Sequence, residues 1–296
     1  PPPLSPPPSP PPPVMSFIIG DESNCPSDSC ISVSDAFYQL EDSSLAGQMV
    51  EIDFSSSSFA LGAGHGDSAT TRRLAGMASG VMPHVTLNNL TLASKIIIRG
   101  DNAIFQGEAS SPASVFTIMR GAPPVIFQGL QFVGSAVAPA ITADGEVSVV
   151  DCLFQGNQGS ALHIRGGTAT VISSQFVSNG APSVSHGGAI RVTNDVGRPK
   201  VLISDSKFVA NSAAYGGAIA VTGALVTVEY STFEGNIAKY DGGALHTLDA
   251  DIRLGNKTQF LANAARQGRT SMVQSGLFAY ILPAPLGTWL PNVVSC

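Results

Sequence analysis

The sequence predicts an all-β fold in which short parallel strands wind into a β-helix solenoid. Five times a phenylalanine is followed three residues later by an asparagine; the pairs are Phe154/Asn157, Phe176/Asn179, Phe208/Asn211, Phe233/Asn236 and Phe260/Asn263. A Gly-(Gly/Ser)-Ala-(Ile/Leu) step follows each of the first four pairs, and the phenylalanines are 22, 32, 25 and 27 residues apart. A period of about 20 to 50 residues indicates a solenoid, a propeller or another repeat array.

The apolar runs inside each period indicate strands rather than helices. They are short and rich in β-branched residues, and Gly, Asn, Ser and Asp separate them; they span residues 147–150, 169–172, 201–203 and 225–228. Helical repeats need apolar positions spaced three and four apart over roughly ten or more residues. We therefore expect two or three short strands in each turn of a parallel β-helix.

Stacked coils place like residues above one another, so each repeated residue type is expected to form a column. The phenylalanines would stack in the interior, with Phe105 and Phe132 as less regular members. The asparagines would form a ladder whose amides satisfy backbone groups at a bend. The paired glycines would form a corner where φ can be positive and neighbouring coils come close. Ala189, Ala218 and Ala244 would face inward beside that corner.

The alternation of Phe-x-x-Asn with Gly-Gly-Ala-Ile resembles the repeat pair of the polymorphic outer-membrane-protein type, over roughly residues 125 to 263. That family forms right-handed parallel β-helices in secreted adhesins and cell-surface proteins. The resemblance implies a right-handed, pectin-lyase-like β-helix solenoid and an extracellular location in a cell wall or at a cell surface. The same fold carries lyases, hydrolases, adhesins and inert spacers, so activity has to be argued from sites.

Residues 1–13 consist almost entirely of proline. Consecutive prolines fix φ and remove backbone donors, so an extended polyproline II N-terminal tract is expected. The Ser-Pro-Pro-Pro blocks resemble the hydroxyproline-rich wall glycoproteins of plants and green algae, of the extensin and pherophorin types. That resemblance implies hydroxylation and O-glycosylation at Pro2, Pro3, Pro6, Pro7, Pro8, Pro10, Pro11, Pro12 and Pro13. A plain linker, or a ligand for a proline-binding domain, is the alternative.

Residues 14–54 are expected to form an N-terminal cap. A partial apolar stripe over residues 31–47 predicts an amphipathic capping helix, which would cover the open first coil of the β-helix. Residues 48–54 follow as a strand. Residues 55–84 are rich in serine and glycine and are expected to leave the barrel as an excursion loop.

The parallel β-helix itself is expected over residues 85–270. Its first strands are predicted at residues 85–92, 95–99, 115–119 and 125–127. The repeat decays after Asn263, so residues 271–296 are expected to form an apolar C-terminal cap or junction.

The cysteines and two sequons point to an oxidising, extracellular compartment. Cys25 and Cys30 are expected to close a short disulfide loop. Cys152 lies in an apolar strand and is expected to be a buried free thiol. Two Asn-x-Thr sequons make Asn89 and Asn256 candidate N-glycosylation sites.

A polysaccharide-cleaving enzyme is an alternative that a β-helix invites. Gly64-His65-Gly66 matches one short polygalacturonase motif, but no Asn-Thr-Asp, Asp-Asp or Arg-Ile-Lys motif accompanies it. Glycosidases need two carboxylates facing one bond. Asp249 and Asp251 would share one strand face, and solvated turn residues explain them equally well. We therefore expect no enzymatic activity, no catalytic residues, no metal site and no cofactor.

The aromatic residues ahead of the glycine pairs form a further expected column. His186 and Tyr215 immediately precede Gly-Gly, and Tyr240 lies one residue further back. In register these rings would form an exposed ladder along one edge of the coils. The ladder either supports the turn by ring stacking or offers aromatic faces to sugar rings.

Charge is distributed unevenly along a chain whose net charge is −6. Residues 1–71 hold nine acids and no Lys or Arg, whereas residues 252–296 hold four basic residues and no acid. An acidic front and a basic back favour head-to-tail contact, which gives an open filament unless it closes. The residues expected in this assembly contact are Arg253, Lys257, Arg266 and Arg269, with Tyr280 and Trp289 as an aromatic dock for a neighbour's proline tract.

The negative charge argues against nucleic acid as a partner, and no apolar run approaches the ~18 residues that span a bilayer. The sequence favours a secreted structural glycoprotein, the repeating subunit of a cell-wall or cell-surface fibre. Its expected partners are copies of itself and covalent glycans, with cell-wall polysaccharide as a further candidate. The alternatives are an adhesin or carbohydrate-binding β-helix module and, second, a polysaccharide lyase or hydrolase.

Overall fold

The computed structural model describes residues 14–19, 30–31, 40, 48–54, 58–60, 84–88, 93–107, 112–183, 186–255, 257–268, 270–273 and 278–280. These residues form strands β1 to β27 and no helix. All strand pairs are parallel, so the predicted all-β parallel solenoid is confirmed. The expected polyproline tract lies outside the described residues, as does the expected capping helix over residues 31–47, apart from Ile31 in β2 and Leu40 in a turn.

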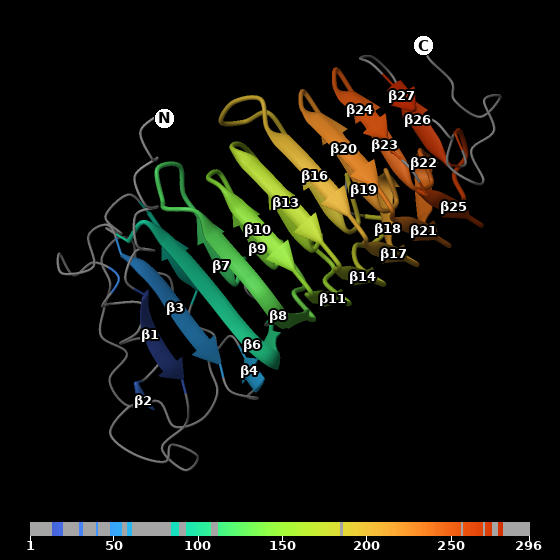
Figure 1. The fold of residues 1–296 in the computed structure, drawn as a ribbon. Helices are drawn as coiled ribbons and strands as arrows, with labels where there is room; N and C mark the ends of the chain where they lie inside the picture. The colour runs from blue at the N-terminus through green and yellow to red at the C-terminus, as the bar shows by residue number, and fades with distance from the viewer. Residues whose placement is uncertain are drawn as a thin grey trace, which may run out of the picture.

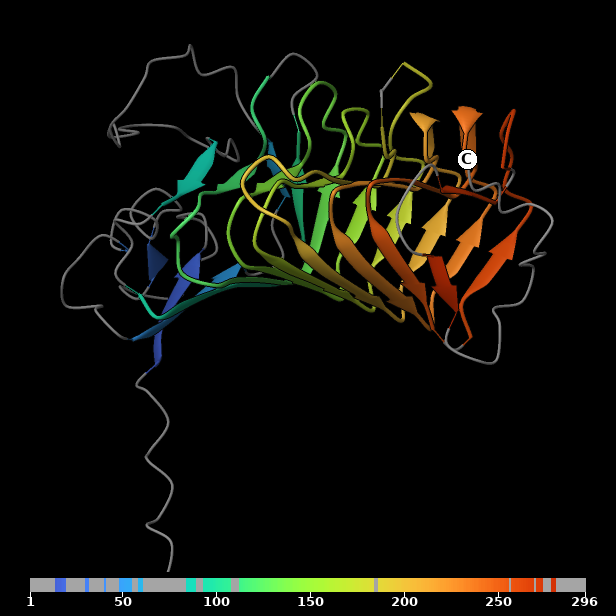
Figure 2. The same ribbon diagram turned by 90° about the horizontal axis from the view of Figure 1, so that it is seen from above.

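The coils stack along one axis, from the N-terminal strands at one end to the C-terminal strands at the other (Figures 1 and 2). The largest sheet has two rows of strands. The first row contains β1 (Val14–Ile19), β3 (Met49–Phe54), β6 (Lys95–Gln106), β8 (Val125–Val133), β10 (Val147–Val150), β13 (Thr168–Ile172), β16 (Lys200–Ser204), β20 (Leu225–Glu229), β24 (Asp251–Leu254) and β27 (Phe278–Tyr280). The second row contains β4 (Ser58–Ala60), β11 (Leu153–Gln155), β14 (Gln175–Val177), β17 (Lys207–Val209), β21 (Thr232–Glu234) and β25 (Gln259–Leu261), and the long β6 and β8 run through both rows. The short β2 (Cys30–Ile31) pairs with the end of β1, at the N-terminal edge of the first row.

Two further sheets complete the coils. The eight-stranded sheet contains β5 (Val85–Leu87), β7 (Phe116–Ile118), β9 (Ile141–Ala143), β12 (Leu162–Ile164), β15 (Ile190–Val192), β19 (Ile219–Thr222), β23 (Leu245–Leu248) and β26 (Ser271–Val273). A two-stranded sheet pairs β18 (Ser212–Tyr215) with β22 (Ile237–Asp241). Figure 2 shows this small sheet set apart from the barrel on one side.

The sheet extends further toward the N-terminus than the boundary expected at residue 85. β1 pairs with β3 over six residues, from Val14 with Met49 to Ile19 with Phe54, and β3 pairs with β6. Sequence reasoning placed no strand over β1. The segment Val-Met-Ser-Phe-Ile-Ile is strand-forming by composition, but it carries neither of the repeat markers on which the prediction depended.

A column of phenylalanine rings fills the interior. Six neighbouring ring pairs from Phe105 to Phe260 have centroids 4.6 to 5.3 Å apart and planes within 17° of parallel. The column contains Phe105, Phe132, Phe154, Phe176, Phe208, Phe233 and Phe260, each at most 4% exposed. Offset stacking of buried rings adds roughly 0.5–1.5 kcal/mol per pair to the hydrophobic gain. The alanines at positions 189, 218 and 244 are fully buried and belong to the same hydrophobic core.

The asparagines form a continuous ladder along the same coils. In each rung the backbone N–H and the Nδ2 of one asparagine both donate to Oδ1 of the asparagine in the next coil, as Asn179 does to Asn211 at 3.0 Å. Nδ2 also donates to the carbonyl of the phenylalanine one coil back, as from Asn179 to Phe154 at 2.9 Å. The ladder begins at Ser135, whose N–H donates to Asn157 Oδ1 at 3.0 Å. It therefore satisfies the buried backbone groups that the bend leaves open.

A second ladder, of hydroxyl groups, lies two residues before each phenylalanine. The N–H groups of Cys152, Ser174 and Ser206 donate to the hydroxyl of the next coil at 3.1 to 3.2 Å. Each of these serine hydroxyls donates to the carbonyl two residues behind it. Cys152 takes the first position of this ladder, and it is the buried free thiol that the sequence predicted. Burial raises the pKa of this thiol to about 12.

Three single-residue bends turn each coil, and all three use the left-handed backbone region. The first bend has φ of 51 to 57° and is formed by Asp151, Ser173, Asp205, Tyr230 and Lys257. The second has φ of 51 to 66° and is formed by Gly156, Ser178, Ala210, Gly235 and Ala262. The third is the glycine corner, with φ of 62 to 69° at Gly187, Gly216 and Gly242. A non-glycine residue in this region costs about 1–2 kcal/mol, which the two ladders on either side of the second strand row offset.

Candidate functional site

The outer face of the eight-stranded sheet carries one outward-pointing residue from the middle of each strand. Parallel register aligns these residues in a single row along the axis. In chain order the row is Thr86, Thr117, Thr142, His163, Arg191, Ala220 and His246. All members except Ala220 are polar or charged, so this face differs chemically from the apolar side that packs on the phenylalanine column.

The glycine corner places a row of rings along one edge of this face. The rings of His186 and Tyr215 stack with centroids 5.2 Å apart, and Tyr215 lies 5.2 Å from Tyr240 in the next coil. His246 lies below them, 5.3 Å from the Tyr215 ring. The expected ladder of His186, Tyr215 and Tyr240 is therefore present, and Tyr240 is 36% exposed. Lys239 adds a cation over the Tyr240 ring, 5.0 Å from its centroid.

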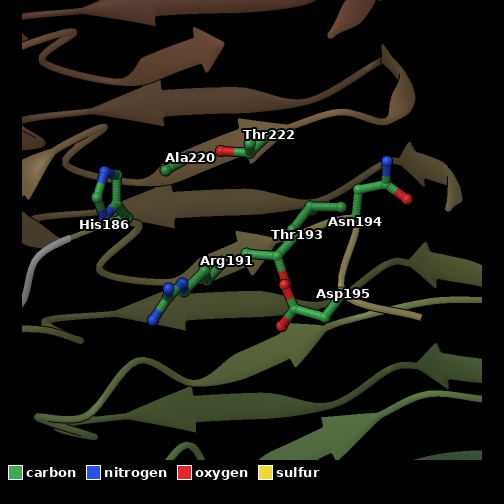
Figure 3. Close-up of a pocket in the computed structure, with 8 residues that line it drawn as sticks. His186, Arg191, Thr193, Asn194, Asp195, Ala220 and Thr222 are labelled. Atoms are coloured by element: carbon green, nitrogen blue, oxygen red, sulfur yellow. The ribbon is translucent and has the colours of Figure 1, made fainter. Parts of the chain in front are cut away.

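A groove of about 320 Å³ lies between this ring row and the loop that follows β15. Its lining comprises His186, Arg191, Val192, Thr193, Asn194, Asp195, Ala220 and Thr222. Figure 3 shows His186 and the Arg191 guanidinium on one side, with Thr193, Asn194 and Asp195 across from them and Ala220 and Thr222 on the neighbouring strand. Ala220 occupies a row position where the neighbouring coils carry Arg191 and His246, and its small side chain leaves the space that becomes the groove.

The loop after β15 is held in place by a glycine on the next coil. Gly223 has φ of +64°, and a Cβ added to it would lie 2.8 Å from the Asn194 Cβ. The absence of a side chain at Gly223 therefore makes room for Asn194. Thr193 is further fixed by its hydroxyl, which lies 3.1 Å from His163 Nε2.

Arg191 is the unpaired cation of the groove. Its Nε is buried and has no hydrogen-bond partner among the residues that the structure describes. The neighbouring Arg165, by contrast, makes a two-pronged contact with Asp144, with both nitrogen–oxygen distances at 2.6 Å. Within the described part of the chain, ion pairs join Arg99, Arg165 and Arg198 to acidic residues, and Arg191 takes part in none of them. A buried donor without a partner is costly, so the guanidinium is suited to an external acceptor.

The histidines beside Arg191 are uncharged at neutral pH. Burial, followed by the positive charge of Arg191, lowers the pKa of His163 to about 4. Burial, followed by the nearby His186, lowers the pKa of His246 to about 4, and its Nε2 has no partner among the described residues. Burial and Arg191 also lower the pKa of His186. The positive charge of the groove at neutral pH therefore comes from Arg191, and Asp195 is the negative charge that also lines the groove.

The residues expected to mediate assembly are only partly within the described structure. Arg253 is exposed on β24, Arg266 is exposed after β25, and Lys257 lies with Nζ 5.9 Å from the Tyr230 ring. Tyr280 ends β27, whose side chains are not described, and Arg269 and Trp289 lie outside the described residues. At the other end, Arg99 forms ion pairs with Glu51 and with Asp53, the latter at 3.1 Å.

Several other predicted positions carry no structural statement. Cys25, Asn89 and Asn256 lie outside the described residues, and Cys30 is described only as the start of β2. Of the two carboxylates weighed for a glycosidase, Asp251 binds Arg198 at 2.8 Å and Asp249 occupies a left-handed bend with φ of 50°. Within the described ranges no three or more His, Cys, Asp or Glu side chains are grouped for a metal ion.

Sequence reasoning did not predict the groove itself. Arg191, Thr193, Asn194, Asp195 and Ala220 carry no repeat motif, and they come together only when neighbouring coils are in register. One available signal was the 32-residue spacing between Phe176 and Phe208, the longest of the four, which leaves room for an extra loop after β15. No helix in the described part of the chain combines the length and apolar character that crossing a membrane requires.

Comparison with known proteins gives one match. Residues 230–248, which contain one Phe-x-x-Asn and Gly-Gly-Ala-Leu unit, are similar to the Chlamydia polymorphic membrane protein (Chlamydia_PMP) repeat. No curated protein and no solved structure matches the chain. A repeat known from membrane surface proteins, on a parallel β-solenoid, is compatible with an extracellular surface or adhesin role.

Proposed function

We propose that this chain is a secreted structural glycoprotein, the repeating subunit of a cell-wall or cell-surface fibre in which β-helices join head to tail. The observation that carries the proposal is the last described coil. Among the described strands, β25 pairs only with β21, β26 only with β23 and β27 only with β24, so each row ends in an edge strand. An edge strand presents unpaired backbone groups that a neighbouring chain can satisfy.

The repeated columns favour a second copy of this chain as the occupant of that edge. Phe260 and Asn263 continue the two columns to the last described coil, where each has a partner on the preceding coil at Phe233 and Asn236. If the first coil of a second subunit lay against this last coil in the same register, its strands would pair with the edge strands and continue the parallel sheets. Contact between the back of one subunit and the front of the next is heterologous and gives an open fibre.

Charge contributes less to this contact than the sequence suggests. Arg253, Lys257 and Arg266 lie near the C-terminal edge, in keeping with a basic back. On the front, however, Glu51 and Asp53 both pair with Arg99 on the next coil, which balances one of their two negative charges. We therefore propose that strand pairing dominates the contact and that charge sets its orientation.

The proline tract serves in this proposal as a glycosylated connector. Its thirteen residues at ~3.1 Å each would span roughly 40 Å in polyproline II, about eight coils at the ~4.8 Å strand spacing. Intact-mass analysis of protein from its natural source should show hydroxylation and sugar increments on this segment. An unmodified N-terminal peptide would remove the connector from the proposal.

Sedimentation and electron microscopy of the native chain test the assembly. The full chain should form fibres, and reversing Arg253 and Arg266 to Glu should weaken them, as should deletion of residues 1–13. A matched reversal of Lys200, an exposed base on β16 in the middle of the rod, should leave assembly unchanged. A monomeric full chain at high concentration and low salt would contradict the proposal.

The second candidate function is that of an adhesin or carbohydrate-binding module. The row of His186, Tyr215 and Tyr240 favours it, because stacked aromatic faces along one edge suit sugar rings. A glycan array probed with the full chain tests this function. A lyase or hydrolase is disfavoured by the sequence alone, and a reducing-sugar assay on polygalacturonate checks that expectation.

A further inference from the structure

We propose that the groove between β15 and β19 binds an acidic sugar unit of an extracellular polysaccharide, with its anionic group on Arg191. The proposal rests on the second candidate function, carbohydrate recognition, and assigns to it a site and a ligand class. The groove lies on the outer face of the eight-stranded sheet and is lined by six polar or charged side chains and two apolar ones.

The space itself is specific to one coil. Row positions on either side of Ala220 carry Arg191 and His246, and each large side chain covers its own stretch of sheet. Only at Ala220 does the row offer a small residue between two large polar ones. Ala220 therefore forms the floor of the groove. Thr222, the last residue of the same strand, also lines it (Figure 3).

The anionic character of the ligand follows from the charges around Arg191. Asp144 neutralises the adjacent Arg165, and the low pKa of His163 and His246 leaves both rings uncharged at neutral pH. Arg191 keeps a buried Nε with no partner among the described residues. A guanidinium presents paired donors that match the two oxygens of a carboxylate. A single acidic group is therefore the acceptor that completes this site.

The opposite side of the groove indicates that the acidic group belongs to a sugar. Thr193, Asn194 and Asp195 present hydroxyl, amide and carboxylate groups within one loop. The Asp195 carboxylate accepts hydrogen bonds from hydroxyl groups and repels a ligand with further negative charge at that position. A ring with one acid and neighbouring hydroxyls fits both sides, as in a uronic acid or a singly sulfated sugar.

The ring row extends the site along the axis. His186 lines the groove and also stacks on Tyr215, which leads to the more exposed Tyr240 in the next coil. A polysaccharide that places one acidic unit at Arg191 can lay its next units over these rings. The site is therefore suited to an internal stretch of a chain rather than to a free monosaccharide.

Titration calorimetry on the full chain at pH 7 and low salt tests the proposal. The probes are polygalacturonate, its fully methyl-esterified form as the neutral counterpart, and a sulfated galactan. Polygalacturonate or the sulfated galactan should bind at least tenfold more tightly than the methyl ester, and the stronger of the two identifies the acid. Moderate salt should weaken binding because the ion pair is only partly shielded from solvent.

Single substitutions distinguish specific binding in the groove from nonspecific electrostatic attraction. Arg191→Gln should reduce the affinity for the acidic glycan at least tenfold. Ala220→Gln should have a similar effect, because the larger side chain would occupy the space of the groove. Arg120→Gln removes an exposed arginine in the turn after β7, three coils from the groove, and should leave binding unchanged. Each variant is used only if its melting temperature matches that of the parent. A further readout is the pKa of His163, which should rise in Arg191→Gln because a neighbouring positive charge is lost.

Three results would overturn the inference in different ways. Equal binding of methyl-esterified and acidic pectin, with no effect of Arg191→Gln, would show that carbohydrate recognition holds but that this acidic site is wrong. Equal losses in Arg191→Gln and Arg120→Gln would show diffuse electrostatic attraction of the glycan to the protein surface, with no specific site. No binding to any glycan, on the array or by calorimetry, would overturn the inference and the carbohydrate-binding function together.

Discussion

Asn211 donates two hydrogen bonds to the same atom of Asn236, one from its backbone N–H at 3.0 Å and one from Nδ2 at 2.9 Å. Its own Oδ1 accepts the matching pair from Asn179, and its Nδ2 reaches the Phe176 carbonyl at 2.9 Å. Each rung therefore depends on the coil before it and the coil after it. Every donor and acceptor of this amide side chain is used inside a fully buried site.

Replacing Asn211 by Ala should lower the free energy of unfolding by at least about 3 kcal/mol. The substitution leaves the Asn179 N–H and the Phe176 carbonyl buried without partners, and each such group costs roughly 1–3 kcal/mol. Urea denaturation followed by circular dichroism measures the change. Asn263→Ala is the control, because Asn263 is half-buried at the end of the ladder and should cost less. Equal costs would show that the ladder does not act through burial.

Replacing Phe208 by Ala should cost ~3–5 kcal/mol through cavity formation. Phe208 is fully buried and stacks between Phe176 at 4.9 Å and Phe233 at 4.6 Å. Phe260→Ala, at the end of the column with one stacked neighbour among the described rings, should cost less. A change below about 1 kcal/mol for Phe208 in denaturant titrations would mean that the column is not a close-packed core.

Two glycine substitutions separate steric from conformational cost. At Gly217 an added Cβ would meet the Gly243 carbonyl oxygen and lie 2.7 Å from the Ile237 backbone nitrogen, so Gly217→Ala should cost about 3 kcal/mol or more. At Gly235 the space is open and only the φ of +62° opposes a side chain, so Gly235→Ala should cost about 1 kcal/mol. Melting temperatures of the two variants give the comparison. The reverse order would mean that the coils are not in contact at the glycine corner.

Stability should fall as the pH is lowered from about 6.5 to about 4. The pKa of His246 is lowered to about 4 by burial and by His186, partly offset by Asp241, so the folded state excludes a proton that the unfolded state binds near pH 6.5. Stability from this group is therefore present at neutral pH and is lost progressively across that window, by roughly 3 kcal/mol for a ring as buried as this one. Chemical denaturation at stepped pH measures the slope. His246→Gln should reduce the slope without abolishing it, because the pKa of His163 is also lowered to about 4. An unchanged slope would assign the pH dependence to other groups.

The coil architecture was predictable because its strongest constraints repeat in the sequence. Phenylalanine fills the core and asparagine forms the ladder in each of these coils, so a Phe-x-x-Asn pair such as Phe233 and Asn236 identifies a coil in the sequence. The hydroxyl ladder was equally regular, at Ser174 and Ser206, but serine is common in turns and its repetition carries less information. Left-handed bends at residues as different as Asp205 and Tyr230 leave no shared residue type to detect.

The groove was not predictable from one sequence for a geometric reason. Arg191 and Ala220 are adjacent only because β15 and β19 pair in this register, and a one-residue slip of either strand would turn its own residue to the core. The alternation of apolar and polar residues over Ile190–Val192 indicates that Arg191 faces outward, but the sequence does not show which arginine lacks a partner. That property depends on contacts between coils, such as the one between Arg165 and Asp144.

The uneven coil lengths have a consequence for how such a chain changes through evolution. Successive asparagines are separated by 22, 32, 25 and 27 residues, yet each adds a single rung to the same ladder. The additional residues are accommodated in the loops, as after β15. Duplicating one coil would therefore lengthen the rod by about 4.8 Å, whereas inserting residues into a loop would alter only its surface. The length of the molecule and the character of its surface can therefore change independently of each other.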